Sequence, residues 1–331
     1  MEPLTKTEIF NKLSSLKFPY FSPYLAMYSS WLGGITTEPA LMFVPVDDHL
    51  VHRGDGVFEA IKIVNGRAYL LEEHLDRLIK SASKLEFDKS VLESKFKNRL
   101  RNIILETSRI AASEIKSELI AFNAIIRLYL SRGPGSFGTN PYDSMGPQIY
   151  CVVTKLTSLA AEKYEKGVSL GRSQISVKPD WFSTVKSCNY LQNVLMKKES
   201  IDRGFDFTVS FTTDGLIAEG STENIVIINK LGELVHPKLD YILKGTTMTR
   251  LFDLVELKAL LQIKRGVDIY EKDLLEAKGI FMIGTTLDIL PVQTYEGHKL
   301  AISNYSKDFL ALLKSDQLNG IQIPSAPIAN I

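Results

Sequence analysis

The sequence predicts an α+β protein of two domains, and three observations support this. The chain has 331 residues, more than a single hydrophobic core usually organises. Stretches of strand-like alternation are interleaved with stretches of helical periodicity, without an internal repeat. Residues 158–167 form a charged stretch without a clear apolar stripe, which is typical of a linker. We therefore expect a smaller N-terminal domain over 1–157 and a larger C-terminal domain over 168–331.

The composition indicates a small-molecule partner. Lysine and arginine total 39 against 38 acidic residues, so no net field attracts nucleic acid or an anionic membrane. The two cysteines, Cys151 and Cys188, have no metal-binding spacing, which fits a reducing compartment and predicts no metal site. No apolar run approaches the ~20 residues of a membrane span, and the polar start lacks the apolar region of a signal peptide. We expect a cytoplasmic protein.

The N-terminal half is expected to begin with a short helix, in an extension over residues 1–26. Turn-forming segments such as VNGR separate short apolar runs further along, as in hairpins. The strands expected here are Ala40–Val44, Val57–Ile63, Arg67–Leu70, Ala124–Ser131 and Gln148–Val153. Helices are expected over Glu73–Lys84 and Val91–Ser113, and the glycine-rich loop RGPGSFGTNPYDSMGP separates the last two strands.

The C-terminal half repeats the mixture of strands and helices. Its expected strands are Val168–Ile175, Phe207–Thr212, Asn224–Asn229 and Gly279–Ile283. Its expected helices are Tyr190–Arg203, Thr247–Leu261 and Ser303–Ser315. Because ligand sites often lie where domains meet, a cleft between the two halves is the expected place for a site.

Lys186 lies among small and polar residues just before an expected helix, in the segment STVKSCNYLQ. Most lysines are solvated surface residues, and Lys197 and Lys198 in the same helix fit that description. The small neighbours of Lys186 cannot shield it in a core, whereas the flanking aromatic residues are untypical of a surface. We therefore expect Lys186 on the floor of a cleft, where partial desolvation favours the neutral amine that forms Schiff bases.

Two glutamates are candidates for a functional carboxylate in the segment DGLIAEGSTENIVI. A DG turn joins two strands there, and Glu219 closes the first of them. A glutamate at a strand end is commonly just solvated, but a fixed anion at this place could hold a proton on a cofactor ring nitrogen. Glu223 is equally plausible by spacing, so the sequence leaves both residues open.

Two Gly-Thr-Thr segments, in ILKGTTMTR and FMIGTTLD, lie where one element gives way to another. Thr246 and Thr247 precede a helix whose free N–H groups could receive a phosphate, although threonine capping of the helix is an alternative. His74 and Arg77 share one face of an expected helix, which is otherwise only a charged surface. Arg77 is the candidate arginine for such a phosphate, with a charged helix surface as the alternative, and His74 is expected to be structural.

The order of these motifs resembles that of the class IV aminotransferases, which are pyridoxal-phosphate enzymes of fold type IV. The series is HRGDGVFEAIKIVNGRAYLLEEHLDRL, KSCNYLQNVL, DGLIAEGSTENIVI, ILKGTTMTR and FMIGTTLDILPV. The resemblance implies two domains, each a β-sheet or barrel-like sheet with packed helices. It also implies a homodimer, because the family's active site takes residues from a second subunit.

The resemblance assigns a role to each candidate residue. Lys186 would form the Schiff base with pyridoxal 5'-phosphate and move the α proton of the substrate, and Glu219 would keep the pyridine nitrogen protonated. The remaining cofactor-binding residues implied are Tyr190 near the 3-oxygen and, at the phosphate, Arg77, Thr246, Thr247 and Thr285. The substrate-binding residues expected are Phe58, Arg127, Arg132 and Thr286.

The substrate is less well defined by the motifs. IIRLYLSRGPGSFGTNP resembles the branched-chain enzymes, with Arg127 at their strand arginine. GDGVFEAIKIVNG resembles D-amino-acid aminotransferases, but their loop should carry an arginine and a histidine where this chain has Phe137 and Thr139. We expect transamination between an aliphatic, branched-chain-like amino acid and 2-oxoglutarate. There are three alternatives. The first is D-amino-acid transamination, and the second is cleavage of aminodeoxychorismate, because those lyases also have SRG at the start of this loop. The third is a non-catalytic protein that binds pyridoxal phosphate.

Overall fold

The computed structural model describes residues 2–328, so Met1 and residues 329–331, the ends of the two predicted domains, lie outside the described part. The chain divides into two compact units. The N-terminal unit comprises Met1–Leu156, Ser187–Asn189 and Gly320–Ile331, and the C-terminal unit comprises Thr157–Lys186 and Tyr190–Asn319. The last segment of the chain, predicted in the C-terminal domain, therefore belongs to the N-terminal unit.

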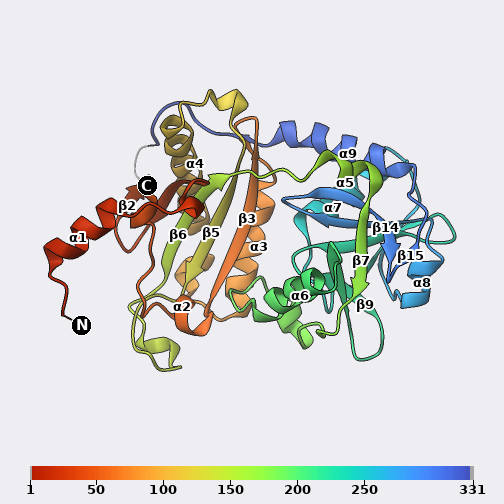
Figure 1. Cartoon of the computed structure of the whole chain (residues 1–331), viewed down its shortest axis with the longest axis horizontal. Coiled ribbons are helices and arrows are strands. Elements are labelled where there is room, and N and C mark those ends of the chain that lie inside the picture. The colour runs from red at the N-terminus through yellow and green to blue at the C-terminus, as the bar shows by residue number, and fades with distance from the viewer. Residues whose placement is uncertain (1, 329–331) are drawn as a thin grey trace. The chain divides into compact units, whose positions relative to one another are not determined.

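The N-terminal unit contains a seven-stranded antiparallel sheet in the order β16-β4-β3-β5-β6-β1-β2 (Figure 1). Its strands are β1 (Tyr24–Ser29), β2 (Gly34–Thr36), β3 (Gly56–Val64), β4 (Arg67–Ala68), β5 (Ala124–Ser131), β6 (Gln148–Lys155) and β16 (Ile321–Gln322). Helix α3 (Leu71–Lys84) packs on β3, and α4 (Ser94–Glu114) packs on β1 and β6. The apolar faces of both helices bury leucine and isoleucine side chains against this sheet.

The C-terminal unit contains a nine-stranded sheet, part of which closes into a barrel. Strands β10, β13, β14, β7, β8 and β9 pair in that order, and β9 pairs back onto β10. The strands of this unit are β7 (Val168–Arg172), β8 (Phe207–Phe211), β9 (Ile217–Gly220), β10 (Asn224–Ile228), β11 (Leu234–Pro237), β12 (Ile263–Val267), β13 (Gly279–Gly284), β14 (Asp288–Tyr295) and β15 (His298–Lys299). Closure leaves these six strands paired on both sides, which removes exposed edges from the barrel.

The barrel buries two separate cores, one on each face of its strands. Side chains from all six barrel strands, including Ile225 and Ile227, share the first cluster. The alternate residues Val226 and Ile228 belong to the second, which packs against α7 (Thr246–Leu257) and α9 (Tyr305–Asp316). Because successive side chains of a strand point to opposite faces, the apolar run NIVII supplies both cores.

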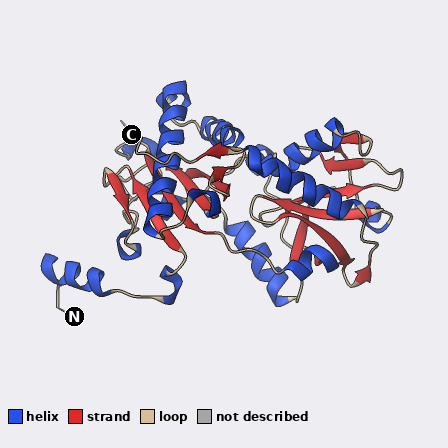
Figure 2. Ribbon diagram, turned by 90° about the horizontal axis from the view of Figure 1, so that it is seen from above, coloured by secondary structure: helices blue, strands red, loops and turns tan. Residues whose placement is uncertain are grey.

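The other helices are short or lie at the surface of their unit. They are α1 (Lys6–Ser15), α2 (His49–Arg53), α5 (Ala161–Lys166), α6 (Leu191–Asp202) and α8 (Glu271–Leu275). Helix α1 buries none of its residues and stands apart from the sheet (Figure 2). Among residues 2–328, no helix combines the length and apolar character needed to cross a membrane. The expected cytoplasmic location stays a prediction.

Most predicted elements agree with the structure to within a few residues, with two differences. The strand expected at Ala40–Val44 is wrong, because Pro39 begins a short 3-10 turn there, and proline fixes φ and offers no N–H to a ladder. The stretch expected as a linker, 158–167, contains α5, which packs on β14.

Candidate active site

Lys186 is almost fully buried in the C-terminal unit, with 9% of its surface exposed. A 3-10 turn, Asp180–Thr184, precedes Lys186 in the chain. Tyr190, four residues after Lys186, is the N-cap residue of α6. The Nζ atom of Lys186 lies 5.8 Å from the centroid of the Tyr190 ring. The predicted lysine and the predicted tyrosine are therefore neighbours.

Glu219 lies on β9, opposite Asn224 of β10. Its Oε2 atom accepts a hydrogen bond from the backbone N–H of Leu243 at 3.1 Å and a longer one from Asn224 Nδ2 at 3.4 Å. Among the described residues no hydrogen bond reaches Oε1. Burial raises the pKa of Glu219 to about 7, although the Leu243 N–H and the charge of Lys186 favour the ionised form.

Glu223 is engaged by its own turn. Its Oε2 atom accepts hydrogen bonds from the Thr222 backbone N–H at 3.0 Å and from Ser221 Oγ at 3.3 Å, and the Thr222 hydroxyl donates to Oε1. Both oxygens of Glu223 thus accept hydrogen bonds within its own turn, whereas only Oε2 of Glu219 accepts hydrogen bonds from the described residues. This difference in contacts distinguishes the two carboxylates that the sequence left open.

Asn224 connects the Glu219 carboxylate to the start of α7. Its Nδ2 atom donates to the Leu243 carbonyl at 2.9 Å and approaches Glu219. A Cβ at Gly245 would lie 1.9 Å from Asn224 Oδ1, so any larger residue at that position would displace the Asn224 side chain. Sequence analysis did not single out Asn224, although an asparagine that opens an otherwise apolar strand was a signal that could have found it.

The N-terminus of α7 presents the first threonine pair. Gly245 is the N-cap residue, and no side chain forms a capping hydrogen bond. The alternative that a threonine caps this helix is therefore wrong. Thr246 and Thr247, at the first helical positions, are 8% and 4% exposed. The first N–H groups of an α-helix have no partner within the helix, and together with the dipole of this twelve-residue helix they make its start a suitable site for a phosphate.

The second threonine pair follows β13, which pairs with β10. Ile283 of β13 lies opposite Asn224, which in turn lies opposite Glu219, so the three strands bring one row of residues together. Thr285 is half-buried in the turn after β13, and Thr286 is exposed. The lysine, the carboxylate and the helix start together match the donor set that pyridoxal phosphate requires at its aldehyde, ring nitrogen and phosphate.

Arg77 belongs to the N-terminal unit, where it is held by Glu59. Its Nε and Nη2 atoms donate to the two carboxylate oxygens of Glu59, each at 2.7 Å. His74 Nδ1 contacts the same carboxylate at 2.7 Å, which fits the structural role expected for it. Burial alone would raise the pKa of Glu59, but the charges and hydrogen bonds of Arg77 and His74 outweigh it and lower the pKa to about 2.

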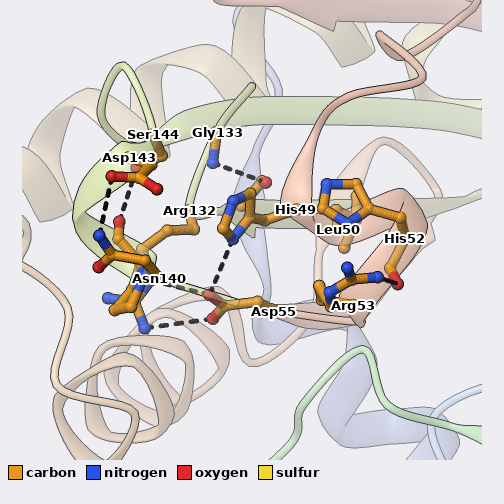
Figure 3. A network of polar contacts seen from close by, with 12 residues as sticks. His49, Leu50, His52, Arg53, Asp55, Arg132, Gly133, Asn140, Asp143 and Ser144 are labelled. Carbon is orange, nitrogen blue, oxygen red and sulfur yellow. Dashed lines mark hydrogen bonds and ion pairs between the residues drawn. The ribbon is translucent and has the colours of Figure 1, made fainter. Parts of the chain in front are cut away.

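Arg132 is enclosed at the start of the glycine-rich loop (Figure 3). Its Nε and Nη2 atoms each lie 3.1 Å from an oxygen of Asp55, and its guanidinium stacks 4.1 Å from the centroid of the Phe87 ring. Two further bonds go to backbone carbonyls just after α3. Asp55 also lies 3.6 Å from His49 Nδ1. These contacts favour a structural role for Arg132.

The other predicted substrate residues lie on neighbouring strands of the N-terminal sheet. Arg127, on β5, is exposed and donates to Thr154 Oγ1 at 3.1 Å. Phe58, on β3, stacks with Tyr129 at a centroid distance of 5.9 Å. In the glycine-rich loop Phe137 is 59% exposed, and its ring lies 5.2 Å from that of His52. The surface of β3 and β5 combines Arg127 with the stacked rings of Phe58 and Tyr129.

Two α+β units with a buried lysine, a carboxylate and a helix start suited to a phosphate fit one class of protein, the pyridoxal-phosphate enzymes of fold type IV. The chain belongs to the amino-transferase class IV family, whose model matches residues 56–295. Pyridoxal phosphate is its cofactor, and the predicted fold class and enzyme class are confirmed.

Individual relatives carry names of more than one activity. The chain is 36% identical over 308 residues to the D-amino-acid transaminase, chloroplastic, of Arabidopsis thaliana, covering 90% of this chain and 78% of the relative. It is 30% identical over 255 residues to a putative branched-chain-amino-acid aminotransferase of Methanocaldococcus jannaschii, covering 77% and 83%. A hypothetical aminotransferase from Mycobacterium tuberculosis, solved with pyridoxal phosphate bound, has a TM-score of 0.75 at 25% identity, covering 89% of this chain and 99% of that one.

Proposed function

We propose that this aminotransferase transfers the α-amino group of an aliphatic, branched-chain-like amino acid to 2-oxoglutarate. The observation that carries the proposal is the position of Arg127, an exposed cation on strand β5 that suits a substrate α-carboxylate. Arg127 is exposed and, within residues 2–328, forms no ion pair with a carboxylate. Its planar fork suits a carboxylate, whereas Arg132 is already paired with Asp55.

The glycine-rich loop supports the same substrate class. Phe137 and Thr139 stand where the D-amino-acid enzymes are expected to carry an arginine and a histidine, so the loop adds no second cation there. The exposed Phe137 ring and the stacked pair Phe58 and Tyr129 offer apolar surface to an aliphatic side chain. Such surface discriminates only weakly, by ~1–3 kcal/mol per methylene, so several aliphatic amino acids should react.

The residues of the C-terminal unit would divide the work as follows. Lys186 would hold the cofactor through its neutral amine and would move the α proton of the substrate. Glu219, with one oxygen that has no hydrogen bond among the described residues, would keep the ring nitrogen protonated. The start of α7, with Thr246, Thr247 and Thr285, would receive the phosphate, and the order of the motifs assigns Arg77 to the same group. Bound pyridoxal phosphate supplies the electron sink.

D-amino-acid transamination is a second candidate, favoured by one specific observation. The 36% identical relative from Arabidopsis thaliana, which matches 90% of this chain, is named a D-amino-acid transaminase. An L- and a D-amino acid that present their α proton to the same lysine exchange the positions of their carboxylate and side chain, so the position of the carboxylate relative to Arg127 separates the two candidates.

The substrate proposal is tested with purified holoenzyme, 2-oxoglutarate and L-leucine, L-valine, D-alanine or D-glutamate, with aminodeoxychorismate assayed separately for pyruvate. Glutamate formation from L-leucine and L-valine supports the proposal. Arg127→Ala should then raise KM for both amino acids, while Arg265→Ala, a surface control on β12, should not. Reaction with D-alanine alone would move the assignment to the D-enzyme, and pyruvate release without amino transfer would overturn transamination.

We further propose that the enzyme is a homodimer, and the exposed face of α6 supports this. Leu191, Val194 and Ile201 are each at least 60% exposed, while Met196 is buried beneath the helix. Unpaired apolar stripes of this kind commonly mark an interface. A light-scattering mass equal to that of one chain would contradict the proposal.

A further inference from the structure

Asn224 lies where strand β9 joins β10 and closes the barrel. Its backbone is opposite Glu219 of β9 on one side and opposite Ile283 of β13 on the other, so both neighbouring strands fix its position. The residue is 7% exposed and opens the otherwise apolar strand NIVII. A buried amide needs hydrogen-bond partners, because an unpaired polar group costs free energy to desolvate. The partners of Asn224 therefore indicate what its side chain does.

The side-chain amide of Asn224 connects two groups outside its own strand. Its Nδ2 atom donates to the Leu243 carbonyl at 2.9 Å and, more weakly, to Oε2 of Glu219 at 3.4 Å. The backbone N–H of Leu243 donates to the same oxygen of Glu219 at 3.1 Å. The carboxylate, the amide and the Leu243 backbone thus form one closed set of hydrogen bonds. A displacement of any of the three groups disturbs its contacts with the other two.

The same side chain also lies against the N-cap residue of α7. Gly245 approaches Asn224 Oδ1 so closely that an added Cβ would be 1.9 Å from this oxygen. Helix α7 begins at the next residue, Thr246. One side chain of β10 therefore meets the carboxylate of β9 with its nitrogen and the residue before α7 with its oxygen.

A rigid cofactor makes the distance between these two places important. Glu219 would meet the ring nitrogen of pyridoxal phosphate, and the start of α7 would meet its phosphate. The aromatic ring keeps these two groups at a nearly fixed separation. The protein must therefore hold the carboxylate and the helix start in a matching arrangement, because a site works well only when its groups are held in position by supporting contacts.

We propose that Asn224 is a positioning residue that fixes the Glu219 carboxylate and the start of α7 relative to each other, so that one cofactor can contact both. The inference rests on the functions proposed above for Glu219 and α7. Asparagine suits this role because its two amide hydrogens can serve the carboxylate and the Leu243 carbonyl at once. An aspartate of the same shape has no N–H to donate and would bring a second negative charge to Glu219.

The first measurement follows the ionisation of Glu219 in full-length protein freed of cofactor. Infrared spectra over a pH series record the carbonyl stretch of its protonated carboxyl group, and Glu219→Gln identifies this band in each variant by removing it. Asn224→Leu keeps a similar shape without a donor, so the midpoint of the band should rise by about half a pH unit or more. Asn224→Asp should raise the midpoint further, because it also adds a like charge.

The second measurement is the binding of inorganic phosphate to the same proteins by calorimetry. Both variants should bind phosphate about tenfold more weakly, which corresponds to ~1.4 kcal/mol, because the segment before α7 loses its contact with β10. Asn229→Leu is the matched control. Asn229 also donates to a glutamate, Glu233, at 2.8 Å, and it follows the other end of β10. This control should change neither the midpoint nor the affinity for phosphate.

The proposal requires both quantities to respond to the loss of the Asn224 amide. A weaker phosphate affinity with an unmoved midpoint, the reverse, or no change in either would overturn it. Competition between inorganic phosphate and pyridoxal 5'-phosphate in the wild type tests the proposed phosphate site separately. Absence of competition would overturn that site, whereas competition together with unresponsive variants would overturn the role of Asn224 alone.

Discussion

Replacing Glu219 with glutamine should change how the stability of the cofactor-free protein depends on pH. The pKa of Glu219 is raised to about 7 in the folded protein from 4.5 in the reference state. Between these two values the folded state binds a proton that the unfolded chain has released. The free energy of unfolding therefore falls as the pH rises through this window. The stability that comes from keeping the proton on Glu219 is fully present only below the window.

The magnitude follows from the same two pKa values. Their difference corresponds to a free energy on the order of 3 kcal/mol between mildly acidic and mildly alkaline solution. Glutamine has nearly the same shape as a protonated glutamate and cannot ionise. Glu219→Gln and the wild type should thus be similarly stable near the acidic end, and the variant should become more stable above neutrality.

The assay is urea unfolding of both cofactor-free proteins at about pH 5 and about pH 8, conditions that bracket most of the titration. The quantity compared is the stability difference between variant and wild type at each pH, since other groups titrate equally in both. Glu276→Gln is a control, because Glu276 lies at the surface and pairs with Lys230. A Glu219→Gln difference that is the same at both pH values would refute the assignment of a buried, proton-holding carboxyl to this position.

Three further results are expected. Arg77→Ala should destabilise the fold by roughly 3–5 kcal/mol in urea unfolding, because it leaves the buried carboxylate of Glu59 without its main partner, and cofactor should dialyse away more readily. Unchanged unfolding would argue against that ion pair. Gly245→Ala should lower cofactor affinity in a titration, since its Cβ would collide with Asn224; full affinity would contradict the geometry at the start of α7. Lys186→Ala should lack the cofactor absorption band that borohydride bleaches in the wild type, and a retained band would place the linkage elsewhere.

Long elements were predictable because their periodicity is unambiguous. Strand β5 was expected over Ala124–Ser131 and occupies these residues, and α3 and α4 were expected within a few residues of their observed ends. Strands of two or three residues, such as β2 and β16, have too few positions for a period to be read. Helix α2 is similarly short, and only its Asp48 N-cap and left-handed Gly54 mark it.

The site divides in the same way between local and non-local information. Lys186 and the two glutamates stand out in their own segments, but only the contacts of Glu223 with its turn distinguish it from Glu219. Asn224 was not singled out, although its place at the start of an apolar strand is a local signal. Its pairing with Glu219 across β9 and β10 arises from the fold, and neither segment alone encodes it.

The return of the last segment to the N-terminal unit affects the order in which the chain can fold. Strand β16 pairs with β4, and the backbone N–H of Ile328 donates to Glu106 of α4 at 3.2 Å. During synthesis from the N-terminus, most of the first sheet leaves the ribosome long before its outermost strand exists. Until the last dozen residues follow, β4 presents an unpaired edge. The C-terminal barrel can therefore close before the unit that was made first is complete.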